Sequence, residues 1–258
     1  MYIAKDKTME NKKYVLTNDT IINLGKTLYK IKAIRNFDNV INCEFGGYVE
    51  SEKNLSHNGD AWVCGDARVY GDARVYGDAR VYGDARVYGN ARVYGDARVY
   101  GNACVYDNAR VSGNACVYDN ARVSGNACVS NDTCVYDNAW VCGSALVCDD
   151  ARVCGSAFVC GSARVYGDAL VCGSACVYGN AKIANKYDIS VISNIGSDCG
   201  STTYAISSNL IFCGCYSGTL EDFEKRVKKI HGNDKFLKQY KNAIAYFELL
   251  KERLYDNN

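Results

Sequence analysis

Proline is absent from this chain of 258 residues, histidine occurs twice, and no long apolar run is present. Without proline, every residue keeps the backbone N–H that a continuous β ladder needs. The N-terminal stretch "MYIAKDKTMENKKY" lacks the apolar core of a signal peptide, and no segment is apolar for long enough to cross a bilayer. We therefore expect a cytoplasmic protein, in the host cytoplasm if it is encoded by a phage, with no membrane partner.

A dominant charge of one sign is also missing, because 30 Lys and Arg residues face 29 Asp and Glu residues. Net charge therefore gives no sign of a nucleic acid partner. Cysteine, by contrast, is plentiful, with 15 residues. Most of them follow the spacing of a repeat, no secretion signal accompanies them, and no pair of Cys-x2-Cys motifs with zinc-site spacing occurs. Reduced thiols are expected, without a metal or another cofactor.

A six-residue repeat fills the middle of the chain. One β-branched apolar residue recurs every six positions from Val63 to Val177, Ile183 closes the series, and no insertion interrupts the 21 units. Two residues before each stands an alanine, replaced once by Thr133. In an extended chain alternate residues point to opposite sides, so Ala and Val point inward, and a Gly-Asp or Gly-Asn pair then turns the corner. A period of six does not fit an α-helix, so the pattern predicts a parallel β-solenoid.

The motif V-x-G-[DN]-A-x resembles the hexapeptide repeat of left-handed parallel β-helices, in which three six-residue sides form one coil. Residues 24–63, with "GKTLYKIKAIRNF" and "FGGYVESEKNLSHNGDAWV", are similar to the N-terminal part of YdcK-like hexapeptide-repeat proteins of bacteria, phages and prophages. The stretch "IGSDCGSTTYAISSNLIFCGCYSGTLEDFEKRVKKIHGN" resembles a module of phage-encoded members. The resemblance implies a mainly β protein, a single-stranded left-handed parallel β-helix of about seven coils with an N-terminal β cap and a small C-terminal α+β module.

Three domains follow from these patterns. A capping segment is expected over 1–59, the β-helix over 60–186 and the α+β module over 187–258. Within the module, short strands are expected between 189 and 215, and helices over about 220–231 and 235–255. Thr219 is the expected N-cap of the first helix, with Asp222 three residues later.

The resemblance raises the question of acyltransferase chemistry, for which hexapeptide enzymes place a histidine base on a coil. Here both histidines lie outside the repeat. His57 suits a turn or a cap, and His231, just before a glycine, suits a helix C-terminus. We therefore expect no enzymatic activity, and an acyltransferase-like enzyme that uses acyl-CoA is the alternative.

The outward positions of the early repeats carry Arg and Tyr on all three sides, and aspartates stand at many corners. Interleaved Arg and Tyr could bind single strands, but the corner aspartates offset the charge, which makes nucleic acid an unlikely partner and favours a solvated surface.

The late repeats break this pattern. Trp140 and Phe158 stand where arginine is usual and should stack, with Cys142 and Cys160 beside them, and Leu146 and Leu170 make the adjoining surfaces apolar. Apolar patches of this kind mark contact surfaces. The preferred cover is the C-terminal module, and another subunit is the alternative, so monomer and trimer both remain open.

These patterns together predict a non-enzymatic structural or binding scaffold, related to a phage or prophage. Its contacts would be made by the late coils and the C-terminal module, with a protein partner or with a second copy of the chain. A phage accessory protein that binds a host factor, a nucleotide ligand or nucleic acid is the other alternative.

Overall fold

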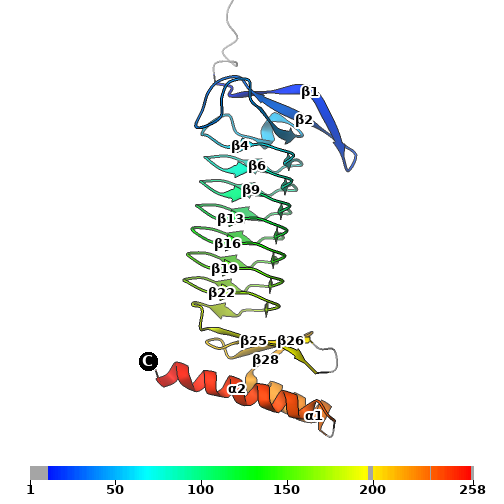
Figure 1. The fold of residues 1–258 in the computed structure, drawn as a ribbon, viewed down its shortest axis with the longest axis vertical. Coiled ribbons are helices and arrows are strands. Elements are labelled where there is room, and N and C mark those ends of the chain that lie inside the picture. Colours follow the sequence, from blue (N-terminus) through cyan, green and yellow to red (C-terminus); the bar gives the residue numbers. More distant parts are fainter. Residues whose placement is uncertain (1–10, 197–199, 233, 257–258) are drawn as a thin grey trace, which may run out of the picture. The chain divides into compact units, whose positions relative to one another are not determined.

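The computed structural model describes residues 11–196, 200–232 and 234–256, which belong to two compact units, 1–132 and 133–258. The fold is a mainly β solenoid of about 8 turns, with antiparallel strands in the N-terminal segment and a β-sheet plus two helices in the C-terminal segment (Figure 1). The solenoid predicted from the six-residue period is thereby confirmed. In the described part of the chain, no helix is both long and apolar enough to cross a membrane.

In the first unit each repeat contributes one two-residue strand. These strands are β4 (Trp62–Val63), β5 (Arg68–Val69), β6 (Arg74–Val75), β7 (Arg80–Val81), β8 (Arg86–Val87), β9 (Arg92–Val93), β10 (Arg98–Val99), β11 (Cys104–Val105), β12 (Arg110–Val111), β13 (Cys116–Val117), β14 (Arg122–Val123) and β15 (Cys128–Val129). Every third strand pairs in parallel, so residues 18 apart lie side by side. The result is three faces: the β4 face (β4, β7, β10, β13), the β5 face (β5, β8, β11, β14) and the β6 face (β6, β9, β12, β15).

The second unit continues the same repeat. Its solenoid strands are β16 (Cys134–Val135), β17 (Trp140–Val141), β18 (Leu146–Val147), β19 (Arg152–Val153), β20 (Phe158–Val159), β21 (Arg164–Val165), β22 (Leu170–Val171), β23 (Cys176–Val177) and β24 (Lys182–Ile183). They pair as β17–β20–β23, β16–β19–β22 and β18–β21–β24.

The interior consists of the small and β-branched residues that the alternation predicted. In both units the repeat alanines and valines are fully buried, as is Thr133. Corners need a left-handed backbone, as at Gly77 with φ +71°, where a Cβ would lie 2.9 Å from the Gly95 nitrogen of the next turn. Asp107 replaces a corner glycine at φ +59°, and its Oδ2 accepts a hydrogen bond from the Gly125 N–H at 3.2 Å. Short polar side chains tolerate this conformation better than other residues with a Cβ.

One turn lies before the repeats and explains why about eight turns replace the predicted seven. β3 (Phe45–Val49) pairs in parallel with β5, and Leu55 forms a bridge with Val75, so a solenoid turn forms inside the expected capping segment. This turn lacks the hexapeptide pattern, which is why the period does not reveal it. Its close packing requires glycine, since a Cβ on Gly47 would lie 2.7 Å from the Ala67 carbonyl oxygen.

The rest of the N-terminal segment forms a hairpin and a short helical turn. β1 (Tyr14–Asn23) and β2 (Lys26–Ala33) pair antiparallel, and β2 also pairs antiparallel with β3 (Figure 1). A 3₁₀ helix, η1 (Glu52–Asn54), follows β3. Leu28 of the hairpin packs with Tyr48 and Tyr70, so the hairpin covers the start of the β5 face.

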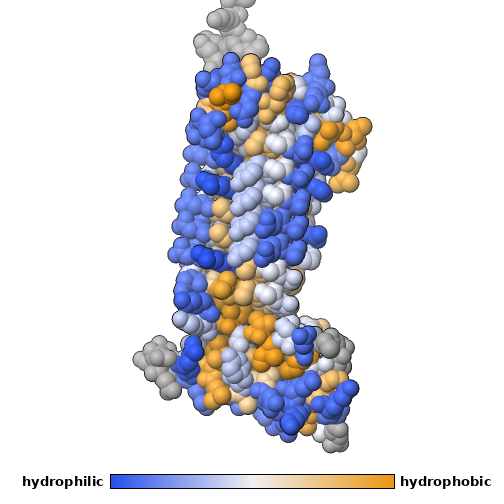
Figure 2. All heavy atoms as spheres, viewed as in Figure 1, coloured by the Kyte–Doolittle hydropathy of each residue, from blue (hydrophilic) through white to orange (hydrophobic). Residues whose placement is uncertain are grey.

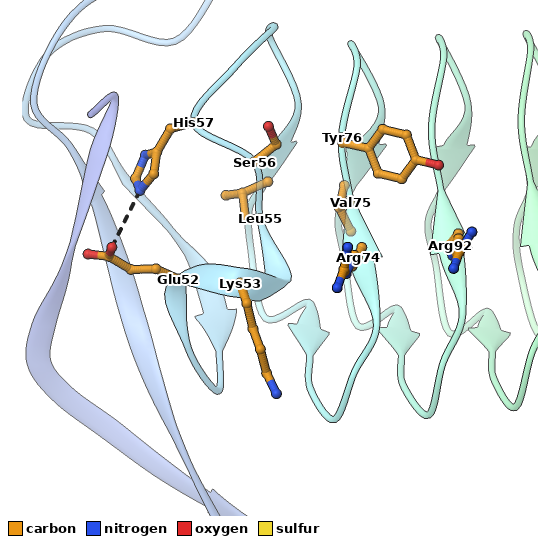
Figure 3. A pocket seen from close by; sticks show the side chains of 9 residues that line it. All are labelled: Glu52, Lys53, Leu55, Ser56, His57, Arg74, Val75, Tyr76 and Arg92. Carbon is orange, nitrogen blue, oxygen red and sulfur yellow. Dashed lines mark ion pairs between the residues drawn. The ribbon is translucent and has the colours of Figure 1, made fainter. Parts of the chain in front are cut away.

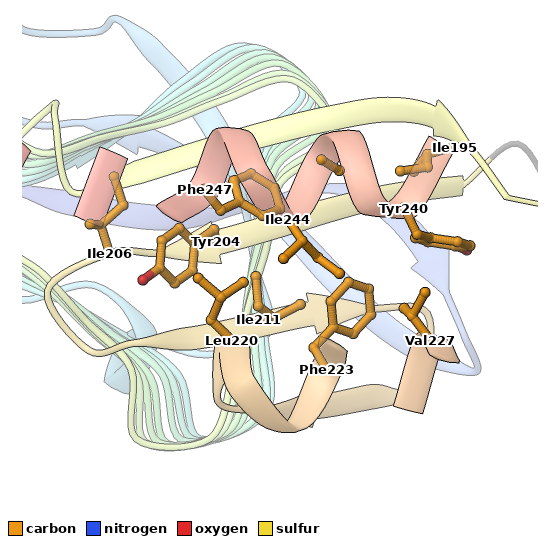
Figure 4. Packing of buried hydrophobic residues seen from close by; sticks show 11 residues of the cluster. Ile195, Tyr204, Ile206, Ile211, Leu220, Phe223, Val227, Tyr240, Ile244 and Phe247 are labelled. Carbon is orange, nitrogen blue, oxygen red and sulfur yellow. The ribbon is translucent and has the colours of Figure 1, made fainter. Parts of the chain in front are cut away.

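The C-terminal module is a four-stranded antiparallel sheet with two helices. The strands are β25 (Ile189–Ile195), β26 (Gly200–Ala205), β27 (Leu210–Cys213) and β28 (Tyr216–Gly218), and the helices are α1 (Leu220–His231) and α2 (Leu237–Asp256). Aromatic and aliphatic side chains of both layers form one core, in which Tyr204 and Phe247 are fully buried (Figure 4).

Side-chain caps fix where the two helices begin. Thr219 Oγ1 accepts a hydrogen bond from the Asp222 N–H at 3.2 Å, the cap that the sequence predicts. The second helix begins at Leu237, two residues after the expected start. The reason is Asp234, whose Oδ1 accepts hydrogen bonds from the N–H groups of Phe236 and Leu237 at 2.8 and 3.2 Å.

Candidate functional site

The late-coil patch, which we define as Trp140, Cys142, Phe158 and Cys160, lies on strands β17 and β20 and just after them. Trp140 and Phe158 are register partners, and their ring centroids lie 5.4 Å apart. The rings meet edge to face at 77°, so they contact each other without the parallel stacking that the sequence suggested. Trp140 remains 38% exposed, a large value for an indole. Figure 2 shows apolar residues gathering on the late coils and on the sheet that follows them.

One cysteine of the patch, Cys142, is an inert thiol at neutral pH. Cys142 is buried, and burial together with the neighbouring Cys160 thiol raises the pKa of Cys142 to about 12. A thiol with such a pKa is protonated at neutral pH and is a poor nucleophile. Cys142 therefore contributes packing to the patch.

Leu146 and Leu170 do not join the other four predicted residues. Leu146, on β18, is the register partner of Arg164, and Leu170, on β22, is the register partner of Arg152. These strands belong to the other two faces of the second unit. Each leucine thus lies beside an arginine on an adjoining face, where the sequence places it, and the late-coil patch itself comprises the other four residues.

The C-terminal module packs on the last turn and leaves Trp140 exposed, in contrast to the cover that the sequence favoured. The Cys176 N–H donates to Thr203 Oγ1 at 2.9 Å, and the Lys182 N–H donates to Ser208 Oγ at 2.7 Å. Tyr178 also donates a hydrogen bond to the Tyr216 carbonyl oxygen at 2.6 Å. The physical reason is the open strand edge of the last turn, whose N–H groups need acceptors.

A second candidate site, which the sequence did not reveal, lies at the start of the β6 face. This β6 groove has a volume of about 600 Å³ and is lined by Glu52, Lys53, Leu55, Ser56, His57, Arg74, Val75, Tyr76 and Arg92 (Figure 3). It exists because the N-terminal segment covers the other two faces. Tyr70 of the β5 face is 6% exposed beneath the hairpin, and Asp38 pairs with Arg80 on the β4 face.

The shape of the β6 groove comes from an interrupted aromatic column. Tyr76 stacks on Tyr94 with ring centroids 5.0 Å apart and planes within 2°. One turn earlier the corresponding position is Ser56, whose N–H donates to the Val75 carbonyl oxygen just as a repeat tyrosine does to the valine of the next turn. A hydroxymethyl group thus replaces a phenol ring, and one face of the Tyr76 ring borders the groove.

Positive charge lines the same groove. Arg74, Arg92 and Arg110 are successive register partners, each is exposed, and none forms an ion pair with a described residue. The other charges in the lining are compensated, because Lys53 pairs with Asp72 at 2.9 Å and Glu52 pairs with Lys12 at 2.7 Å. The hydrogen bond from Lys12 holds the pKa of Glu52 below its usual value.

His57 borders the groove, but one of its ring nitrogens is hydrogen-bonded and the other is buried. The ring stacks on Tyr14, with ring centroids 4.3 Å apart. Nδ1 accepts a hydrogen bond from the Lys13 N–H at 3.4 Å. Nε2 faces Glu52 Oε2 at 3.7 Å and is buried without a hydrogen-bond partner (Figure 3). Burial is the main reason why the pKa of His57 is lowered. His57 therefore lies in the bend that follows η1, where it packs against Tyr14.

His231 ends α1, as the sequence predicts. Its Nδ1 lies 2.6 Å from Asp234 Oδ2, and its ring stacks on Tyr240 at 5.0 Å. Across the described ranges, no three His, Cys, Asp or Glu side chains are arranged to hold a metal ion.

Comparison with known protein families finds a match for the six-residue repeats. A family described as YdcK Beta solenoid repeat matches ten segments of this chain, namely 61–77, 67–83, 73–89, 79–95, 85–101, 91–106, 97–113, 103–119, 115–131 and 163–179. No curated protein matches the chain. The likeness of the C-terminal stretch to phage-encoded proteins, on which no match falls, stays a prediction. The matched segments lie within the solenoid, on the repeats whose buried Ala and Val and left-handed corners are described above, and these repeats thus belong to the YdcK β-solenoid repeat family.

Proposed function

We propose that this protein is a non-enzymatic binding scaffold whose contact surface is the late-coil patch and whose partner is a protein. The observation that carries the proposal is the Trp140–Phe158 pair, of which Trp140 is exposed and Phe158 half-buried, at positions where other repeats have arginine. Large aromatic side chains are favoured at the centres of protein interfaces, where they bury much area at little entropic cost. A solvated face gains nothing from an indole that is 38% exposed.

The surroundings of His57 support a binding role over acyl transfer. A general base must reach the proton that it abstracts, directly or through one water. His57 Nδ1 already accepts a backbone hydrogen bond, and its Nε2 is buried against Glu52. A lowered pKa without access to substrate gives no catalysis, so His57 is poorly placed to act as the base for acyl transfer.

The test uses Trp140 as its own reporter. The chain has two tryptophans, and Trp62 is 1% exposed, so acrylamide quenching of fluorescence reports mainly on Trp140. We expect native mass spectrometry of the protein from its own host to show a complex, with a second copy or another protein, in which Trp140 is protected. Phe158→Arg should release the partner and raise quenching of Trp140 by about twofold or more, since it places a charge in the contact.

Leu170→Arg is the control, because it adds the same charge at an exposed leucine on another face. It should leave both the complex and the quenching unchanged. A protein that stays a bare monomer at all concentrations, with quenching equal in the Phe158→Arg variant and its parent, would contradict the proposal.

A further inference from the structure

The β6 groove combines an uncompensated pair of guanidinium groups with an uncovered aromatic ring. We propose that it is a binding site for a nucleoside phosphate, with the phosphate on Arg74 and Arg92 and the base on Tyr76. The site is in the first unit and does not depend on the late-coil patch, so the two proposals stand or fall separately.

The arginine pair indicates a phosphate. Arg74 and Arg92 are register partners on adjacent parallel strands, whose spacing is about 4.8 Å. Like charges so placed repel each other, and neither has an ion pair among the described residues. One carboxylate matches one guanidinium fork, whereas a phosphate carries up to two charges on three terminal oxygens and can bridge two forks. Lys53 and Glu52 are already paired, so they neither supply nor cancel this attraction.

The interrupted column indicates a flat ring. Tyr76 and Tyr94 already stack with nearly parallel planes, and Ser56 occupies the position where a third ring would extend the column. A planar base in that position would stack on Tyr76 within the groove (Figure 3). The groove volume of about 600 Å³ suits a ligand of this size.

Isothermal titration calorimetry with adenosine 5′-monophosphate tests the proposal on the full chain. We expect saturable binding, and we expect adenosine and inorganic phosphate each to bind at least about tenfold more weakly, because each lacks one of the two contacts. Arg74→Gln with Arg92→Gln should weaken binding by about tenfold or more, since it removes the charge-assisted hydrogen bonds. Arg86→Gln with Arg122→Gln, which removes two exposed arginines from the β5 face, should leave the affinity unchanged.

A second variant blocks the site without removing any group that binds. Ser56→Tyr would restore the missing ring of the column and fill the space meant for the base, so it should abolish binding while the melting temperature stays within a few degrees. Absence of binding at millimolar nucleotide, equal affinity in the Arg74→Gln/Arg92→Gln variant, or phosphate that binds as tightly as the nucleotide would each overturn the proposal.

Discussion

Single residues at the corners set how closely successive turns approach each other. Gly161 and Gly179 occupy the same corner column, with φ of +68° and +64°. A Cβ at Gly161 would lie 2.8 Å from the Gly179 nitrogen, whereas a Cβ at Gly179 would meet no atom of the described residues within 4 Å. The two glycines thus share the demand for a left-handed backbone, and they differ in whether a further turn packs against them.

Alanine substitutions at these two glycines therefore distinguish the cost of a strained backbone from the cost of a clash with the next turn. Gly179→Ala should lower the free energy of unfolding by about 1 kcal/mol, through the left-handed backbone alone. Gly161→Ala should cost about 1–3 kcal/mol more, because its methyl group presses on the backbone of the next turn. Urea unfolding followed by circular dichroism measures both. Equal losses in the two variants would mean that the turns can separate without cost.

At the scale of elements, the pair of helices in the C-terminal module is joined by an exposed ion pair. Lys251 Nζ of α2 lies 2.6 Å from Glu221 Oε1 of α1, and Asn209 also donates to this carboxylate. The Lys251 hydrogen bond is the largest cause that lowers the pKa of Glu221 to about 2. A carboxyl whose pKa falls on folding stabilises the folded state above its unfolded pKa, and that contribution is lost as pH falls toward the folded pKa.

The pH range of this effect follows from the unfolded and folded pKa values of Glu221, 4.5 and about 2. Between about pH 4.5 and pH 2 the parent protein should lose more stability than Glu221→Gln does, and the curves of unfolding free energy should converge near pH 2. The side chain is 54% exposed, so solvent screening limits the effect to about 1 kcal/mol or less. Glu252→Gln, on an exposed site of α2, serves as the control and should run parallel to the parent. Parallel curves for Glu221→Gln as well would show that the pair contributes nothing.

Elements differ in how well their sequence predicts them. The solenoid strands follow from a strict period of six, and the start of α1 follows from Thr219. The β6 groove cannot be predicted from the sequence, because Arg and Tyr occur alike on all three faces of the early repeats. Which face stays open depends on where the hairpin, the Asp38 loop and η1 settle, and these segments carry no repeat. A periodic pattern specifies a fold well and a unique site poorly.

At the scale of the molecule, the repeats of the first unit are interchangeable in multiples of three. Residues 18 apart are register partners with the same buried Ala and Val, so removing one complete turn leaves every remaining contact type in place. Stability of such repeat arrays is close to a sum over units and their neighbours. Register, however, depends on the alternation of inward and outward residues.

Deletion of residues 83–100 should therefore give a folded protein with a cooperative melt and a modestly lower free energy of unfolding. Deletion of residues 83–85 alone should be far more damaging, because it exchanges inward and outward positions after the cut and turns valines toward water. Thermal melts by circular dichroism and hydrogen exchange distinguish the two. A well-folded three-residue deletion would mean that burial of Ala and Val does not set the register.

The tyrosine columns of the first unit also have an optical consequence. Their rings repeat at 4.8–5.1 Å with planes within 5° of parallel. At such separations the electronic transitions of neighbouring phenols are no longer independent, so excitation energy absorbed by one ring can pass to the next ring in the column. The first unit thus carries a built-in chromophore array whose spectrum depends on the spacing of its turns.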